Sequence, residues 1–516
     1  MEKQSRYDAI VIGAGIGGLT SASLLAKQGL KVVVLEALER VGGCCSNYDF
    51  GGYKPEVGAV FIILKDLYKN YFELIGRRLE DYVDFKLLDP VYDIVIERDE
   101  RYVLPRDFAA MEEVVRRINP GDVDGYRRYC RDAKAIFDAQ KAGLDFPMPA
   151  LKDVYSFKTL MKTLRAVNTK ALAALPVAAR MAPRNMDRVI RSYFKDERLQ
   201  LIFGWENLYA ALPAHRANGM FSLMTYLGHE GYYYPKGGMI AIPQAMAKIC
   251  GEYGAEVRLN SAVKRIMVKN GKATGVEMTT GEVLESKVVI SNAHSRVTYL
   301  NLVGAANLPS WAVKTVRRQP CSIPAPTIYL NLKEKVGAQA HFTILLNRRR
   351  KFDDLWWEFY DRGLLYRADD GPMMVSVPSY SDEGLAPEGK DTLSAIYIAP
   401  YKLKYYEWEE IATDWAWELA HSIERRAFPG LTAKIESIES VPPTRLERTL
   451  NVPEGAFFGL EMNGTNMGPF RPRYRSGLVG NLYLTGQCTN PGGGVPMVMT
   501  SGIIMSSILM QNWNKL

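Results

Sequence analysis

One segment near the start of the chain constrains the fold more than any other. Residues 7–36 read YDAIVIGAGIGGLTSASLLAKQGLKVVVLE: an apolar strand, a glycine-rich turn, a helical stretch rich in Ala and Leu, and a second apolar strand that ends at an acid. Strand, helix and strand within about 30 residues form a βαβ unit with parallel strands. The sequence therefore predicts an α/β fold that begins with a Rossmann-type unit.

The glycines of this unit predict what it binds. Gly13, Gly15 and Gly18 form a G-x-G-x-x-G motif. The first glycine permits the tight turn, the second lets the backbone approach a pyrophosphate, and the third lets the helix pack on the strand. Glu36 follows 18 residues after Gly18, where its carboxylate can accept both hydroxyls of an adenosine ribose. This acid disfavours a 2′-phosphate, so the motif predicts a dinucleotide other than NADP.

The segment after Glu36 distinguishes FAD from NAD. It reads ALERVGGCCSNYDFGGYKPEVGAVFI, with a second glycine pair at Gly42 and Gly43. This segment resembles the flavin amine oxidase and phytoene desaturase superfamily. The pattern that they share is an acid, then five residues, then a glycine pair, then a later D/E-x-G-x. The resemblance implies that this segment runs along the pyrophosphate and the ring of FAD.

Three further segments resemble one branch of that superfamily, the bacterial-type phytoene desaturases, carotenoid isomerases and retinol saturases. They are GYYYPKGGMIAIPQAMAKICGEYGAEVRLNSAVKRI, starting at Gly231, LAPEGKDTL, starting at Leu385, and GNLYLTGQCTNPGGGVPMVMTSG, starting at Gly480. The matches run from residue 7 to residue 510. The C-terminal segment is closer to phytoene desaturases, whereas GGCC is closer to retinol saturases, and Gln487 replaces the acid usual after Y-L-x-G.

The resemblance implies a set of residues that hold one FAD without a covalent bond. They are Gly13, Gly15, Ile16, Gly17, Gly18, Glu36, Ala37, Gly42, Gly43, Cys44, Cys45, Val263, Gly486, Gln487, Gly494, Val495 and Met497. Vicinal cysteines form only a strained disulfide, so we interpret Cys44 and Cys45 as small packing residues beside the flavin. The five histidines lack the spacing of metal ligands, and no metal site is expected.

The order of segments along the chain predicts two interleaved domains. Residues 1–86, 230–300 and 450–516 are expected to form a Rossmann-type FAD-binding domain, and residues 87–229 and 301–449 an α+β substrate domain. Asn270-Gly271 between alternating segments predicts a β-hairpin in the first domain. The segment from about residue 87 to residue 230 is predicted to be mostly helical.

A basic segment predicts contact with a membrane. Residues 151–195 contain ten lysines or arginines, two aspartates and many apolar residues, which is typical of a helix lying in an anionic interface. A solvated basic face of the domain is the alternative. Sparse cysteines and no apolar leader favour the cytoplasm, with peripheral, monotopic membrane association. The net charge of +8 comes without any nucleic-acid-binding signature, so no nucleic acid is expected as partner.

Three functions follow as hypotheses. The first is an FAD-dependent oxidoreductase acting on carbon–carbon bonds of a long apolar substrate, by desaturation of a carotenoid or isoprenoid or, alternatively, by carotenoid isomerisation or retinol-saturase-like reduction. The second is a flavin amine oxidase acting on a small amine, which the basic middle region and the branch resemblance disfavour. The third is a non-catalytic flavoprotein. No side chain stands out as a general base, and the motifs specify no electron acceptor.

Overall fold

The structure, a computed structural model, describes residues 6–143, 169–210, 212–348, 355–463, 466 and 468–516. Its first sheet has seven strands drawn from three distant parts of the chain. In spatial order these are β7 (Glu256–Arg258), β2 (Val32–Leu35), β1 (Arg6–Ile12), β10 (Val283–Ser291), β9 (Lys272–Met278) and β8 (Val263–Lys269), with β16 (Leu482–Leu484) also paired to β10. Strands β7, β2, β1, β10 and β16 run parallel, and β9 and β8 are antiparallel. The predicted α/β class is confirmed.

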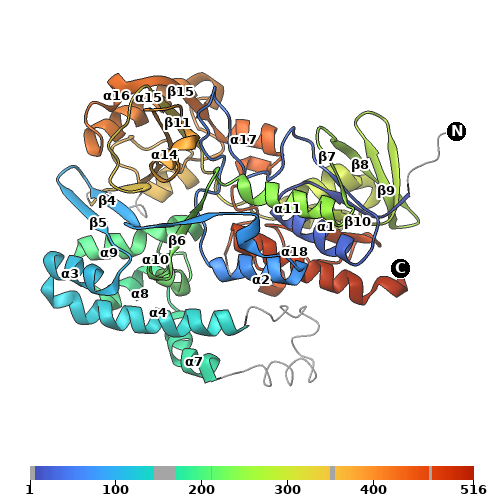
Figure 1. Ribbon diagram of the computed structural model, residues 1–516, viewed down its shortest axis with the longest axis horizontal. Coiled ribbons are helices and arrows are strands. Elements are labelled where there is room, and N and C mark those ends of the chain that lie inside the picture. Colours follow the sequence, from blue (N-terminus) through green and yellow to red (C-terminus); the bar gives the residue numbers. More distant parts are fainter. Residues whose placement is uncertain (1–5, 144–168, 211, 349–354, 464–465, 467) are drawn as a thin grey trace.

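Strand β1 is apolar from Ala9 to Ile12, where both faces of this sheet are covered. Ala9 and Val11 pack in one buried cluster with helices, whereas Ile10 and Ile12 pack in another on the opposite face. Helices α1 (Ile16–Lys27), α11 (Ala241–Glu252) and α18 (Val495–Gln511) lie together on the first face (Figure 1). A parallel sheet buried on both faces needs continuous hydrophobic strands, as observed here.

The turn between β8 and β9 lies where the sequence predicted a hairpin. Asn270 and Gly271 both have positive φ, at 51° and 71°. A two-residue hairpin turn with positive φ at both positions matches the twist of the flanking strands, and Asn-Gly is its preferred pair. The pair therefore sets the register of the strands at this edge of the sheet.

The second sheet also has seven strands and lies apart from the first, at the upper left of Figure 1. In spatial order they are β15 (Ile435–Val441), β11 (Thr327–Leu332), β14 (Asp391–Ile396), β13 (Met373–Ser376), β12 (Phe342–Leu346), β4 (Tyr92–Ile96) and β5 (Glu100–Leu104). Helices α15 (Trp408–Arg426) and α16 (Leu431–Lys434) cover it. A third, two-stranded sheet pairs β3 (Phe85–Leu88) with β6 (Tyr232–Pro235).

The prediction of mostly helical structure after residue 87 is wrong at its start. Residues 92–104 form the β4–β5 hairpin at the edge of the second sheet. All five residues of β4 are buried, so the strand lacks the alternation of apolar and polar residues that marks a half-exposed strand. Beyond it the described residues as far as residue 230 are mainly helical, with α3 (Phe108–Ile118), α4 (Val123–Gly143), α7 (Thr169–Met181), α8 (Met186–Tyr193), α9 (Glu197–Gly204) and α10 (Leu227–Glu230).

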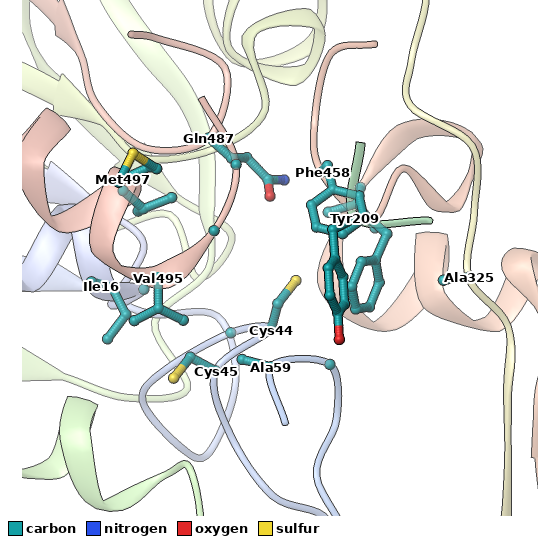
Figure 2. A pocket seen from close by; sticks show the side chains of 18 of the residues that line it. Ile16, Cys44, Cys45, Ala59, Tyr209, Ala325, Phe458, Gln487, Val495 and Met497 are labelled. Atoms are coloured by element: carbon teal, nitrogen blue, oxygen red, sulfur yellow. The ribbon is translucent and has the colours of Figure 1, made fainter. Parts of the chain in front are cut away.

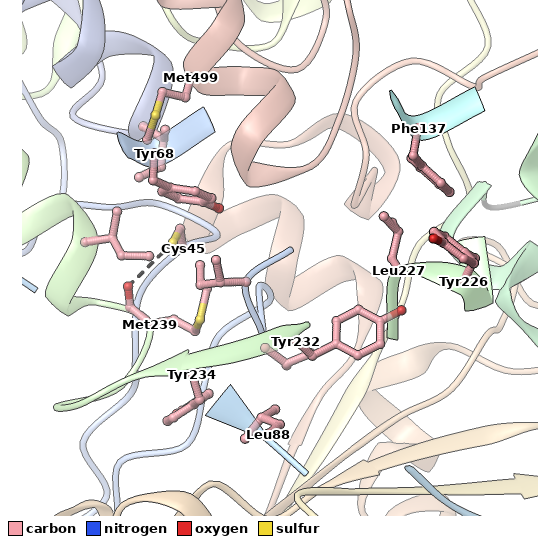
Figure 3. Close-up of a cluster of buried hydrophobic side chains, with 14 of the residues drawn as sticks. Cys45, Tyr68, Leu88, Phe137, Tyr226, Leu227, Tyr232, Tyr234, Met239 and Met499 are labelled. Atoms are coloured by element: carbon pink, nitrogen blue, oxygen red, sulfur yellow. Dashed lines mark hydrogen bonds between the residues drawn. The ribbon is translucent and has the colours of Figure 1, made fainter. Parts of the chain in front are cut away.

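The remaining helices join these layers. They are α2 (Lys65–Ile75), α12 (Ser310–Arg318), α14 (Pro378–Ser381) and α17 (Pro443–Leu450). The chain's abundant tyrosines are mainly core residues, and several around β6, including Tyr232 and Tyr234, are fully buried (Figure 3). Within the described ranges, no helix combines the length and the hydropathy that crossing a bilayer requires.

Candidate FAD and substrate site

A cavity of about 900 Å³ begins at the turn between β1 and α1 and extends to α4 and the second sheet. Most of the side chains that line it are apolar. Figure 2 shows Ile16, Val495 and Met497 on one side of the cavity, Tyr209 and Phe458 on the other, and Cys44 between the two. The two glycine-containing ends of the chain therefore meet at one wall of a single large apolar space.

The turn after β1 has the shape that a pyrophosphate site requires. Gly13 has a φ of 93°, and a Cβ added to Gly18 would lie 2.1 Å from the Gly13 carbonyl oxygen. Gly15 lies at the N-terminus of α1, which has neither a capping side chain nor an acid in its first turn. The free N–H groups of that turn and the helix dipole favour an anion here.

Glu36 lies at the end of β2 beside this turn. One carboxylate oxygen accepts a hydrogen bond from the Ala14 backbone N–H at 2.7 Å, and the other from the Leu38 N–H at 3.0 Å. Burial raises the pKa of Glu36, and these amide hydrogen bonds act against that rise. Each oxygen keeps a lone pair for a ribose hydroxyl, so the fixed carboxylate fits an adenosine.

The C-terminal segment closes the site from the other side. Gly494, with a φ of 102°, precedes α18, whose N-terminus also has no capping side chain and no acid. Helices α1 and α18 cross closely, since a Cβ on Gly502 would lie 2.6 Å from the Thr20 Cβ. The N-termini of α1 and α18 thus both border the cavity, and neither has an acidic side chain that would offset its positive dipole end.

Asn292 joins the N-terminal and C-terminal parts of the site. It follows β10, and its N–H donates to the Ile12 carbonyl at 2.9 Å. A methyl group on Gly15, Gly17 or Gly486 would come within 2.5–2.7 Å of its side-chain amide. These three glycines therefore leave room for Asn292, which itself lines the cavity.

Cys44, Cys45 and Gln487 line the middle of the cavity. Burial raises the pKa of the Cys44 thiol to about 11, and the pKa of Cys45 is raised as well. Both cysteines are therefore neutral packing groups at physiological pH, not nucleophiles. Arg471 holds the backbone at this point, donating to the Gln487 carbonyl at 2.6 Å.

Most of the residues expected from the sequence line this cavity. They are Gly13, Gly15, Ile16, Glu36, Ala37, Gly42, Gly43, Cys44, Cys45, Val263, Gln487, Gly494, Val495 and Met497. Gly17, Gly18 and Gly486 lie behind its wall and act in packing. The glycine turns, the two helix N-termini and Glu36 fit the pyrophosphate and the adenosine of FAD.

Sequence reasoning missed Asn292 and the far wall of the cavity. The only signal for Asn292 was its place at the carboxyl end of a strand, where α/β sheets bind ligands. The far wall includes Phe61, Tyr209, Ala325 and Phe458, which come from separate parts of the chain. No local pattern connects these residues.

Together, fold and site define a flavoprotein oxidoreductase. The chain belongs to the family of flavin-containing amine oxidoreductases, whose family model matches residues 16–509. It binds FAD, and the resemblance to the phytoene desaturase branch is confirmed.

Two curated relatives match nearly the whole chain. The neurosporene-forming phytoene desaturase of Rhodobacter capsulatus is 31% identical over 514 residues, covering 97% of this chain and 93% of that protein. The zeta-carotene-forming phytoene desaturase of Myxococcus xanthus is 28% identical over 511 residues, with the same coverage of 97% and 93%. Among solved structures, wild-type putrescine oxidase with bound putrescine shares the fold, with a TM-score of 0.61 and 14% identity over 99% of this chain and 100% of that one.

Proposed function

We propose that this FAD-dependent oxidoreductase desaturates a long, carotenoid-type isoprenoid chain. The observation that carries the proposal is that the cavity of about 900 Å³, which also holds the FAD site, continues beyond the FAD motifs as an apolar space reaching α4 and the second sheet. A long hydrocarbon has no polar groups to bind, so it needs an extended apolar wall of this kind. The two phytoene desaturases that match nearly the whole chain support the same substrate class.

The acids around the cavity argue against a small amine as substrate. Among the described residues that line it, Glu36 is the only carboxylate, and it is fixed beside the α1 turn by two backbone amides. An ammonium group would need a carboxylate or an aromatic cage at the flavin ring. Tyr209 and Phe458 offer aromatic faces to the cavity, but among the described lining residues no carboxylate accompanies them.

The protein's own contribution to this reaction is binding and exclusion of water. FAD, when bound, supplies a two-electron acceptor for the substrate. Tyr209 and Phe458 lie across the cavity from Ile16, Val495 and Met497 of the FAD site, so they can hold a hydrocarbon against the bound flavin (Figure 2). Holding one C–H bond within about 3–3.5 Å of the acceptor atom supplies much of the rate enhancement.

Anaerobic mixing with a substrate tests the proposal directly. Phytoene in liposomes should bleach the visible absorbance of the oxidised flavin in one turnover, and the extracted product should have gained one C=C bond. A product with rearranged but no additional double bonds would identify an isomerase instead. Bleaching by small polar amines alone would overturn the proposal in favour of an amine oxidase.

We also propose a division of the chain between cofactor and substrate. Residues 1–86, 230–300 and 450–516 hold FAD, and residues 87–229 and 301–449 enclose the hydrocarbon. The strands of the first sheet come from the first set of residues, and all strands of the second sheet come from the second set, which supports this division. The β3–β6 ladder connects the two sets.

We further propose that the protein docks on a membrane through the segment 151–195. Residues 151–168 lie outside the described residues, but α7 presents Leu172 and Leu175 with 55% and 57% of their surfaces exposed. Helix α4 lies next to α7 and packs against it (Figure 1). Its residues Ile136 and Phe137 line the cavity. Docking at α7 would bring the α4 wall of the cavity close to the bilayer that holds an apolar substrate.

Co-sedimentation with anionic liposomes tests this docking. The double variant Leu172→Ser/Leu175→Ser should bind roughly 30-fold more weakly, because each exposed leucine inserted in the interface contributes on the order of 1 kcal/mol. The matched control is Leu74→Ser/Leu87→Ser, which removes exposed leucines from α2 and β3. Equal loss of binding by both pairs would contradict the assignment to α7.

A further inference from the structure

The carboxyl group of Glu206 lies buried among aromatic residues beside the cavity. Glu206, in the short helix Trp205–Ala210, has no exposed surface. Its neighbours Trp205 and Tyr209 line the cavity. Isolated carboxylates are rarely buried because the loss of hydration is costly, so this one calls for a specific role.

Three hydroxyl groups donate hydrogen bonds to Glu206. The Thr225 hydroxyl lies 2.8 Å from Oε2, and the Tyr232 and Tyr92 hydroxyls lie 3.0 and 3.3 Å from Oε1. The Tyr92 hydroxyl is in turn 3.5 Å from that of Tyr209. All three bonds to the carboxyl suit its ionised form, which only accepts hydrogen bonds.

Two of these tyrosines connect Glu206 with the substrate space. Tyr232 and Tyr209 both line the cavity. In Figure 3 the hydroxyl of Tyr232 points toward Leu227, another residue of the cavity wall. In Figure 2 Tyr209 lies across the cavity from Ile16 and Val495, where the FAD motifs meet. A proton leaving a hydrocarbon here would meet a phenol first and the carboxylate next.

The surroundings leave Glu206 able to gain and lose a proton near neutral pH. Burial raises its pKa to about 7, against the hydrogen bonds from Thr225, Tyr232 and Tyr92. The other ionisable groups that face it are the phenols of Tyr129 and Tyr209. Among the described residues, no lysine or arginine forms an ion pair with it.

We propose that Glu206 is the acceptor of the proton that leaves the substrate during desaturation, acting through the hydroxyl groups of Tyr232 and Tyr209. The inference rests on the proposed function. One substrate C–H bond breaks with transfer of a hydride to oxidised FAD. At the neighbouring carbon the C–H bond breaks, its electron pair forms the new C=C bond, and its proton passes to a tyrosine oxygen. That tyrosine gives its own proton on to Glu206, directly from Tyr232 or through Tyr92 from Tyr209, and remains neutral.

The pH dependence of single-turnover flavin bleaching tests this role. Glu206 accepts a proton only when ionised, above its pKa, so the wild-type rate should rise about tenfold from about pH 6 to about pH 8. Glu206→Gln should remove this rise and slow the reaction about 100-fold at the higher pH. Glu206→Asp should recover part of the rate and keep the pH dependence.

Glu56→Gln is the matched control. Glu56 is equally buried, its pKa is likewise raised to about 7, and a tyrosine hydroxyl, that of Tyr234, donates to it, but neither residue lines the cavity. This variant should keep the pH profile. Infrared pH titration of the FAD-loaded protein without substrate gives an independent readout, in which Glu206→Gln should remove one carboxyl group titrating near neutral pH.

The outcomes separate the two proposals. Failure of phytoene to bleach the wild-type flavin at any pH would overturn the proposed function, and with it this inference. Bleaching that is equally fast and equally pH-dependent in wild type and Glu206→Gln would overturn the proton-acceptor role alone. So would loss of the pH profile in Glu56→Gln with retention in Glu206→Gln.

Discussion

Gly18→Ala should yield a protein that is purified without the yellow colour of FAD. The added Cβ would lie 2.1 Å from the Gly13 carbonyl oxygen, a backbone atom that cannot rotate away as a side chain would. Relief requires that α1 move off β1, which shifts the N–H groups that face the pyrophosphate. Overpacking of this kind costs on the order of 3 kcal/mol, so FAD affinity should fall about 100-fold. Titration of the apoprotein with FAD, followed by flavin fluorescence, measures the change.

Gly251→Ala provides the control for this experiment. Gly251 lies in α11, on the same face of the first sheet, and nothing lies within 4 Å of the position of its added Cβ. Alanine favours a helix over glycine by about 1 kcal/mol, so this variant should remain yellow and be slightly more stable. Stoichiometric FAD of unchanged affinity in Gly18→Ala would show that the turn tolerates the added carbon and would contradict the packing argument.

The parts of the fold predicted correctly are those with short-range causes. The strand, turn and helix of residues 7–36 follow from hydrophobic period and glycine position, and the Asn270-Gly271 turn follows from positive φ at both residues. The β4–β5 hairpin was missed because β4 is buried on both faces. Its apolar run therefore carries no period that would distinguish a strand from a buried helix.

The residues of the site likewise fall into those that local sequence predicts and those that only the fold reveals. Residues of the glycine motifs were predictable because each has a local conformational requirement. Asn292 was not, because its role depends on the approach of Gly15, Gly17 and Gly486 from three other places in the chain. Glu206 was also invisible: within the sequence FGWENLYA a glutamate has the pattern of a solvated residue, and only the fold surrounds it with tyrosines.

Ala325→Phe should slow turnover of a long hydrocarbon about 100-fold while leaving FAD in place. Ala325 lines the cavity, away from Ile16 and Val495, and is 8% exposed (Figure 2). It lies between Pro324 and Pro326, whose fixed φ angles keep the backbone from withdrawing to make room. The phenyl ring should therefore occupy the cavity, and a hydrocarbon displaced by about 1 Å at the flavin loses on the order of 100-fold in rate.

The decisive comparison is between FAD content and single-turnover bleaching by phytoene. Ala325→Phe should retain the flavin content of wild type and its reduction by dithionite, because no FAD motif is altered. Ala109→Phe, which places the same ring on the exposed face of α3, should behave as wild type in both measurements. If Ala325→Phe bleaches as fast as wild type, the hydrocarbon does not run past Ala325. The substrate path would then have to be sought along the α4 side of the cavity, where Ile136 and Phe137 form the wall.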